Sequence, residues 1–161
     1  MPLYVVVGWL LFASSLVFGV WRGGPERVTA ILFAMAWGAT LLLRSEHGHR
    51  YFHLETGVMV VDVVLLGALT AVAIFAKRLW PIFCVACAAL TAAGHAARAL
   101  DTQSSTTAYM LLSVFSGFTM PVTILIGTAR HRRRLVRIGA DPSWSGCSPR
   151  LLWMLKTLRI D

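Results

Sequence analysis

The stretch that says most about the fold is Lys77–Asp101, KRLWPIFCVACAALTAAGHAARALD. It begins with two cations, followed by Trp80 and Pro81, and continues as an apolar run rich in alanine and cysteine. A helix needs ~20 predominantly apolar residues to cross the core of a bilayer. His95 and Arg98 lie near the end of this run, at helical spacing from the residues before them. We therefore predict a transmembrane helix with a polar end, packed at the centre of a small bundle.

The amino-acid composition indicates that lipid surrounds much of the protein. Of the 161 residues, 57% are hydrophobic and 14% are charged, and the mean hydropathy is +0.70. Soluble domains carry roughly 25% charged residues. The apolar content exceeds what one small core can bury, so much of the surface must contact lipid. The net charge of +8 does not indicate a nucleic-acid partner, because the basic residues flank apolar runs instead of forming a patch.

Apolar runs along the whole chain predict an all-α, polytopic membrane protein with about five transmembrane helices, forming one bundle over residues 1–129. The first run lacks a preceding basic region and a cleavage site, so we expect a retained span and not a signal peptide. The second run is the shortest and could be tilted or partly interfacial. The five runs are Leu3–Trp21, Val28–Leu43, Gly57–Ala76, Leu79–Ala99 and Thr107–Ala129.

Small residues recur at four-residue spacing within these runs. Helices in lipid associate through close backbone approach, because lipid tails are as apolar as leucine. We therefore expect the small residues to mark contacts between helices. They are Ser15 and Gly19; Ala30, Ala34 and Gly38; Gly67 and Ala71; Ala88, Ala92 and Ala96; and Ser113 and Gly117.

The positive charges predict the orientation of the bundle. With five spans and an outer N-terminus, twelve Lys and Arg residues fall on the inner side and three on the outer side, which are Arg44, Arg50 and Arg98. Cytoplasmic loops carry an excess of Lys and Arg. The expected topology is N-out and C-in, in the inner (plasma) membrane of a bacterium.

A basic cytoplasmic tail is predicted over residues 130–161. The first part of this tail, Arg130–Arg137, either acts only as a determinant of topology or also contacts anionic lipid headgroups. Arg150–Ile160 has apolar residues at helical spacing, which suits a short interfacial helix or a helix docked on a partner. The candidate headgroup contacts are Arg130, Arg132, Arg133, Arg134 and Arg137.

An intramembrane polar cluster is predicted from Asp62, His95 and Arg98. The short connection at Lys77 makes two neighbouring spans antiparallel, which puts Asp62 and His95 at similar depths, about 8 Å from the outer surface at ~1.5 Å per residue. Thr91 lies on the same helical stripe as His95 and Arg98. An unpaired charge facing lipid costs several kcal/mol, so Asp62 should pair with Arg98 or His95. The cluster is either a structural clamp or a proton relay, since histidine titrates near neutral pH.

Two further groups contain residue types that can bind metal or exchange electrons. The longest loop, Arg44–Thr56, carries residue types that bind transition metals, but their spacing is not specific for a metal site. The alternative to a metal site is a loop that contacts only solvent. Cys84 and Cys87 form a C-x-x-C pair within an apolar run, where packing as small apolar residues is the alternative to redox activity. The sequence does not identify a cofactor. The candidate metal ligands are His47, His49, His53 and Glu55.

The order of several motifs resembles that of small, uncharacterised bacterial multi-span inner-membrane proteins. The motifs are Asp62, Arg78-Leu-Trp-Pro81, His95, Gly127-Thr-Ala-Arg-His-Arg-Arg-Arg134 and Gly139-Ala-Asp-Pro-Ser-Trp144. No activity is assigned to those proteins, so the resemblance implies membrane location alone.

Short loops and the absence of common catalytic fingerprints favour a non-enzymatic role. The leading hypothesis is an accessory subunit of a larger membrane complex or a self-associating bundle, with the bilayer and other membrane subunits as partners. The alternative is a small transporter, channel or proton relay that uses Asp62, His95 and Arg98. A membrane enzyme that uses the histidine-rich loop or the cysteine pair is the third hypothesis.

Overall fold

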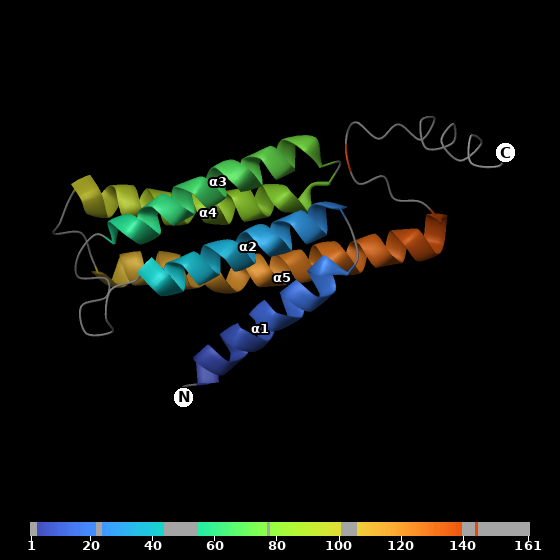
Figure 1. The fold of residues 1–161 in the computed structure, drawn as a ribbon, viewed down its shortest axis with the longest axis horizontal. Helices are drawn as coiled ribbons and strands as arrows, with labels where there is room; N and C mark the ends of the chain where they lie inside the picture. Colours follow the sequence, from blue (N-terminus) through green and yellow to red (C-terminus); the bar gives the residue numbers. More distant parts are fainter. Residues whose placement is uncertain are drawn as a thin grey trace.

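The computed structural model of the protein describes residues 3–21, 24–43, 55–76, 78–100, 106–139 and 144. These residues form five α-helices and no named strand (Figure 1). The predicted all-α class is confirmed. The predicted surface helix at Arg150–Ile160 lies outside the described residues. The helices are α1 (Leu3–Val20), α2 (Gly24–Leu43), α3 (Thr56–Phe75), α4 (Trp80–Leu100) and α5 (Thr106–Ile138).

Four of these helices, α2 to α5, are long and apolar enough to cross a membrane. The apolar part of α1, Val6–Val20, is shorter. The protein is therefore a multi-pass membrane protein by helix length and hydropathy. Large apolar side chains such as Val64, Phe83 and Phe115 are exposed on the outer faces of the helices, which is the surface expected to meet lipid.

The four long helices run side by side, and α1 crosses them obliquely (Figure 1). The α3–α4 hairpin closes through a short connection, as the sequence predicts. Helix α4 packs against both α3 and α5, and α2 packs against α3. Helix α1 lies against α5 and α2. Aromatic contacts join α1 to α2, since the Phe12 and Trp37 ring centroids lie 3.9 Å apart and those of Trp9 and Trp37 lie 4.2 Å apart.

The buried core contains apolar side chains from four helices. Ala30, Cys84 and Ile124 are fully buried, and Leu69 is 1% exposed. Because lipid offers no hydrophobic driving force between helices, this core is held by close packing. Cys84 and Cys87 belong to it as free, buried thiols.

Two glycines permit the closest helix contacts. A Cβ at Gly19 would lie 2.7 Å from the Cβ of Ala30, and a Cβ at Gly127 would lie 2.8 Å from the Trp80 ring. Gly67 and Gly117 instead face open space, with no atom within 4 Å of an added Cβ. These two glycines therefore do not mark contacts between the five described helices.

Helix α5 is longer than its apolar run. The sequence places the end of the last span at Ala129, whereas the helix continues without a break through Ile138. No glycine or proline interrupts residues 130–138, and Gly139 then adopts φ +73°. Its amide donates to the Leu135 carbonyl at 3.0 Å, which caps the helix. The arginines of residues 130–137, which we call the basic extension, therefore project from a continuous helix.

Replacing either contact glycine by alanine is expected to destabilise the bundle. Overpacking of a tight contact costs about 1–3 kcal/mol, so Gly19→Ala and Gly127→Ala should lower the thermal midpoint of the protein in detergent. Gly67→Ala and Gly117→Ala are the matched controls and should be neutral or slightly stabilising, since alanine favours helices. Equal midpoints for all four variants would contradict these contacts.

Candidate functional site

Two buried polar clusters lie at opposite ends of the bundle. The first, the His95 cluster, contains Asp62 of α3, His95 of α4 and Tyr109 of α5. His95 is 1% exposed, and its Nε2 lies 3.0 Å from Asp62 Oδ2. Its Nδ1 lies 2.7 Å from the Tyr109 hydroxyl. One imidazole thus joins three helices near the ends of α4 and α5 that face away from the α3–α4 connection.

The donor pattern of the His95 cluster follows from its chemistry. An ionised Asp62 can only accept, so Nε2 of His95 must donate to it. With a neutral ring, Nδ1 accepts the Tyr109 hydroxyl proton, and both ring nitrogens are satisfied inside the protein. The Asp62 side chain keeps 18% of its surface exposed. The cluster therefore has one partly open member and two buried ones.

The structure brings together two of the residues predicted for this cluster, Asp62 and His95. Arg98 is buried at 6% exposure, one turn along α4 from His95. Thr91 donates its hydroxyl to the Cys87 carbonyl of its own helix at 3.1 Å. Tyr109 is absent from the prediction, because its position near the end of an apolar run is equally typical of an interfacial tyrosine.

The second polar group, the Arg78 cluster, contains Glu26, Arg78 and His131. Arg78 lies in the α3–α4 connection, its Nη1 donates to Glu26 Oε1, and its Nη2 lies 2.9 Å from His131 Nδ1. Glu26 is fully buried, and Arg78 and His131 are 9% and 6% exposed. The cluster joins the first turn of α2 and the final third of α5 to the connection between α3 and α4.

Arginine chemistry assigns the protonation of His131. A guanidinium only donates hydrogen bonds, so Nδ1 of His131 must accept, and the ring is neutral with its proton on Nε2. The buried charges are then one cation and one anion. Glu26 also lies in the first turn of α2, where the helix dipole favours a negative charge. Its Oε2 and the Thr29 hydroxyl have no hydrogen-bond partner among the described residues.

Trp144 lies against this same end of the bundle. It pairs with Ala76 through an isolated antiparallel bridge. Its indole nitrogen would lie only 2.4 Å from a Cβ at Gly24, so a larger residue at the start of α2 would require the Trp144 ring to move. Ala76, at the end of α3, is thus held by Trp144, which follows α5 in the chain.

Sequence reasoning did not identify the Arg78 cluster. Arg78 and His131 belong to basic stretches that flank apolar runs, a pattern that predicts only orientation. One signal was present, since Glu26 is the only acidic residue before Glu46. A lone carboxylate beside a membrane-spanning run and surrounded by cations is a candidate for an ion pair.

An apolar layer separates the two clusters. Its buried side chains come from α3, α4 and α5, and His95 lies ~22 Å along α4 from the helix start at ~1.5 Å per residue. The layer is built by Leu65, Leu69, Cys84, Met120 and Ile124.

Other predicted site residues fall in different places. His47, His49 and His53 lie outside the described residues, and Glu55 is half-buried just before α3. The described residues contain no group of three or more metal-ligand types that converge. The metal hypothesis therefore stays a prediction. Cys84 and Cys87 lie within the core, as described above.

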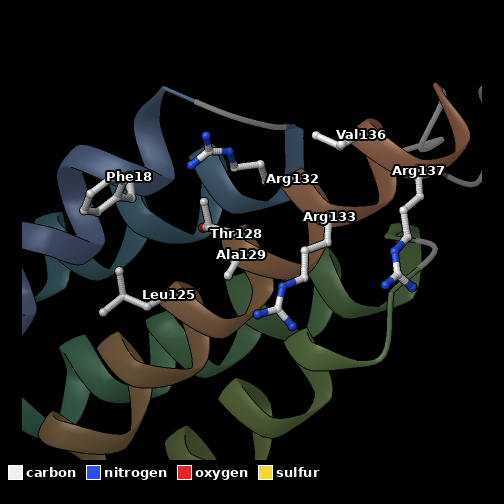
Figure 2. Close-up of a pocket in the computed structure, with 8 residues that line it drawn as sticks. All are labelled: Phe18, Leu125, Thr128, Ala129, Arg132, Arg133, Val136 and Arg137. Atoms are coloured by element: carbon white, nitrogen blue, oxygen red, sulfur yellow. The ribbon is translucent and has the colours of Figure 1, made fainter.

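The basic extension borders two clefts. One, of about 700 Å³, lies between the end of α1 and α5 (Figure 2). The other, of about 530 Å³, lies between the start of α4 and α5 beside the Arg78 cluster. All five candidate headgroup arginines are exposed, namely Arg130, Arg132, Arg133, Arg134 and Arg137.

Comparison with known proteins finds no matching family model, no similar curated protein and no similar solved structure.

Removing Arg78 is expected to destabilise the bundle strongly. Arg78→Ala would leave Glu26 charged and unpaired in a buried site, which costs about 3–5 kcal/mol. Arg130→Ala, which removes an exposed arginine at the same end, should change little. The measurement is unfolding in mixed detergent–SDS micelles. Adding Glu26→Gln to Arg78→Ala should restore part of the loss, and equal stability of the two single variants would contradict a structural ion pair.

Proposed function

We propose that the protein is a non-enzymatic integral membrane protein that works by association, either as an accessory subunit of a membrane complex or as a self-associating bundle. The observation that carries this proposal is the apolar layer between the two polar clusters. Movement of a proton or ion through the bundle needs a connected series of polar groups or water. Leu69 and Ile124 are buried in the apolar core between the two clusters.

Exposed small residues support association through the helix faces. Gly67 and Ala71 lie one turn apart on α3, both exposed, and an added Cβ at Gly67 would meet no atom within 4 Å. Small residues at this spacing allow close approach of a second helix in lipid. This face of α3 suits a helix of another subunit or of a second copy.

A proton relay is the second candidate function. The 18% exposure of the Asp62 side chain favours it, because protons can reach the carboxylate from that end of the bundle. His95 and Tyr109 would then carry a proton toward α5. The apolar layer beyond His95 limits this relay to one half of the bundle.

We further propose five membrane spans, with the N-terminus outside and the C-terminus inside the inner membrane of a bacterium. Helix α1, at 18 residues, is about 27 Å long at ~1.5 Å per residue, close to the thickness of a bilayer core. The Arg78 cluster supports the charge bias, since its contacts gather the start of α2, the α3–α4 connection and the basic extension at one end.

Proteoliposomes and native membranes test association against transport. Purified protein in liposomes should show no proton flux above that of empty liposomes under an imposed pH gradient. In mild detergent the protein from native membranes should migrate as an assembly larger than the monomer, and Gly67→Leu should shift it toward the monomer. Val114→Leu, which enlarges an exposed side chain on α5, is the control. Proton flux that Asp62→Asn abolishes would favour the relay and contradict our proposal.

The native Cys147 reports the side of the C-terminal segment. A membrane-impermeant maleimide should not label it in intact spheroplasts but should label it in inverted vesicles, because the C-terminus is inside. Cys147→Ser should remove this signal, since Cys84 and Cys87 are buried in α4. Labelling of Cys147 in intact spheroplasts would reverse the proposed orientation.

A further inference from the structure

The cleft between α1 and α5 has the chemical layout of an amphiphile. We call it the α1–α5 groove, and its lining includes Phe18, Leu125, Thr128, Ala129, Arg132 and Arg133. Figure 2 shows Phe18 and Leu125 at one side of the groove, Thr128 and Ala129 between the two helices, and Arg133 and Arg137 at the other side. Its volume of about 700 Å³ is large enough for a headgroup and the first part of an acyl chain.

The helical repeat of α5 produces this layout. Leu125, Ala129 and Arg132 or Arg133 follow one another at three- and four-residue steps, so they share one face of the helix. That face changes from apolar to cationic at the point where the apolar run ends. The change takes place at the membrane surface if α5 spans the bilayer.

The charge of the groove is uncompensated within the described part of the chain. None of its lining residues is acidic, and Arg132, Arg133 and Arg137 form no ion pair with the described residues. The second cleft differs, because its lining includes Arg78, which Glu26 already neutralises. Figure 2 shows the Arg132 side chain on the side of α1 and those of Arg133 and Arg137 on the other side, so guanidinium groups flank the groove on two sides. A guanidinium binds the oxygens of a phosphodiester in a bidentate manner.

We propose that the α1–α5 groove binds an anionic phospholipid of the surrounding leaflet. The arginines hold the phosphate headgroup, and Phe18 and Leu125 contact the start of an acyl chain. A soluble phosphate compound would leave the apolar side of the groove empty. This proposal depends on α5 spanning the bilayer, but it does not depend on the association proposed above.

Native mass spectrometry of the detergent-purified full chain tests the proposal. The probes are phosphatidylglycerol and phosphatidylcholine with identical acyl chains. One phosphatidylglycerol should be retained at a concentration at least about tenfold lower than phosphatidylcholine, since each arginine near an anionic lipid contributes a few-fold in affinity or more. Equal retention of the two lipids would overturn the proposal.

Two pairs of substitutions distinguish a defined groove from general attraction to positive charge. Arg132→Gln with Arg133→Gln should remove the preference for phosphatidylglycerol. Arg130→Gln with Arg134→Gln removes the same charge from the other side of α5 and should leave the preference within about threefold of the wild type. An equal loss in both double variants would show diffuse attraction and overturn a site in the groove.

A steric variant keeps the test independent of charge. Ala129→Trp fills the middle of the groove, keeps every arginine, and alters an exposed position that is not expected to unfold the protein. It should reduce retention of phosphatidylglycerol at least as strongly as the loss of two arginines, and unchanged retention would overturn the proposal. Glycerol phosphate without acyl chains should not displace the lipid, and displacement by it would identify a soluble phosphate compound as the occupant.

Discussion

The buried contact of Arg78 with Glu26 and His131 is the interaction on which the arrangement of this bundle most depends. Placing a cation and an anion in a medium of low dielectric costs several kcal/mol per ion, and only close pairing offsets that cost. A shift of α5 by one helical turn would move His131 about 5.4 Å away from Arg78. This cost holds the α3–α4 hairpin, α2 and α5 in one mutual register. A shift of one of them would leave a buried polar group of this cluster unpaired.

The His95 cluster performs the same task at the other end of the bundle. Asp62, His95 and Tyr109 come from three successive helices, so the imidazole connects α3 to α5 through α4. Between the clusters the helices meet through apolar packing, which in lipid selects no register by itself. Polar groups at both ends thus supply the specificity that the apolar middle lacks. The cationic side chains of the basic extension lie instead at the surface, beside the two clefts.

Part of the candidate site could be predicted from the sequence because it depends on chain connectivity. The short connection at Lys77 forces α3 and α4 to be antiparallel neighbours, so the depth of Asp62 and His95 follows from counting residues. The Arg78 cluster could not be found in this way. Glu26 and His131 are far from Arg78 in the sequence, and the pattern of an arginine beside an apolar run is the same whether it faces water or a buried carboxylate.

By itself, the sequence determined the membrane class and the approximate limits of the five helices in the described residues, because these depend on local hydropathy and on the length of each apolar run. It did not predict that α5 continues through Ile138, because the change in polarity at Ala129 indicates the end of the last span. Only the tertiary structure decided which face of each helix points inward. It showed that Gly19 and Gly127 lie in tight contacts, whereas Gly67 and Gly117 have no neighbouring atom within 4 Å of an added Cβ. It also showed that Arg78 is buried. The physical reason is that lipid and protein interior are equally apolar, so the rotation of each helix about its axis depends on contacts with other helices.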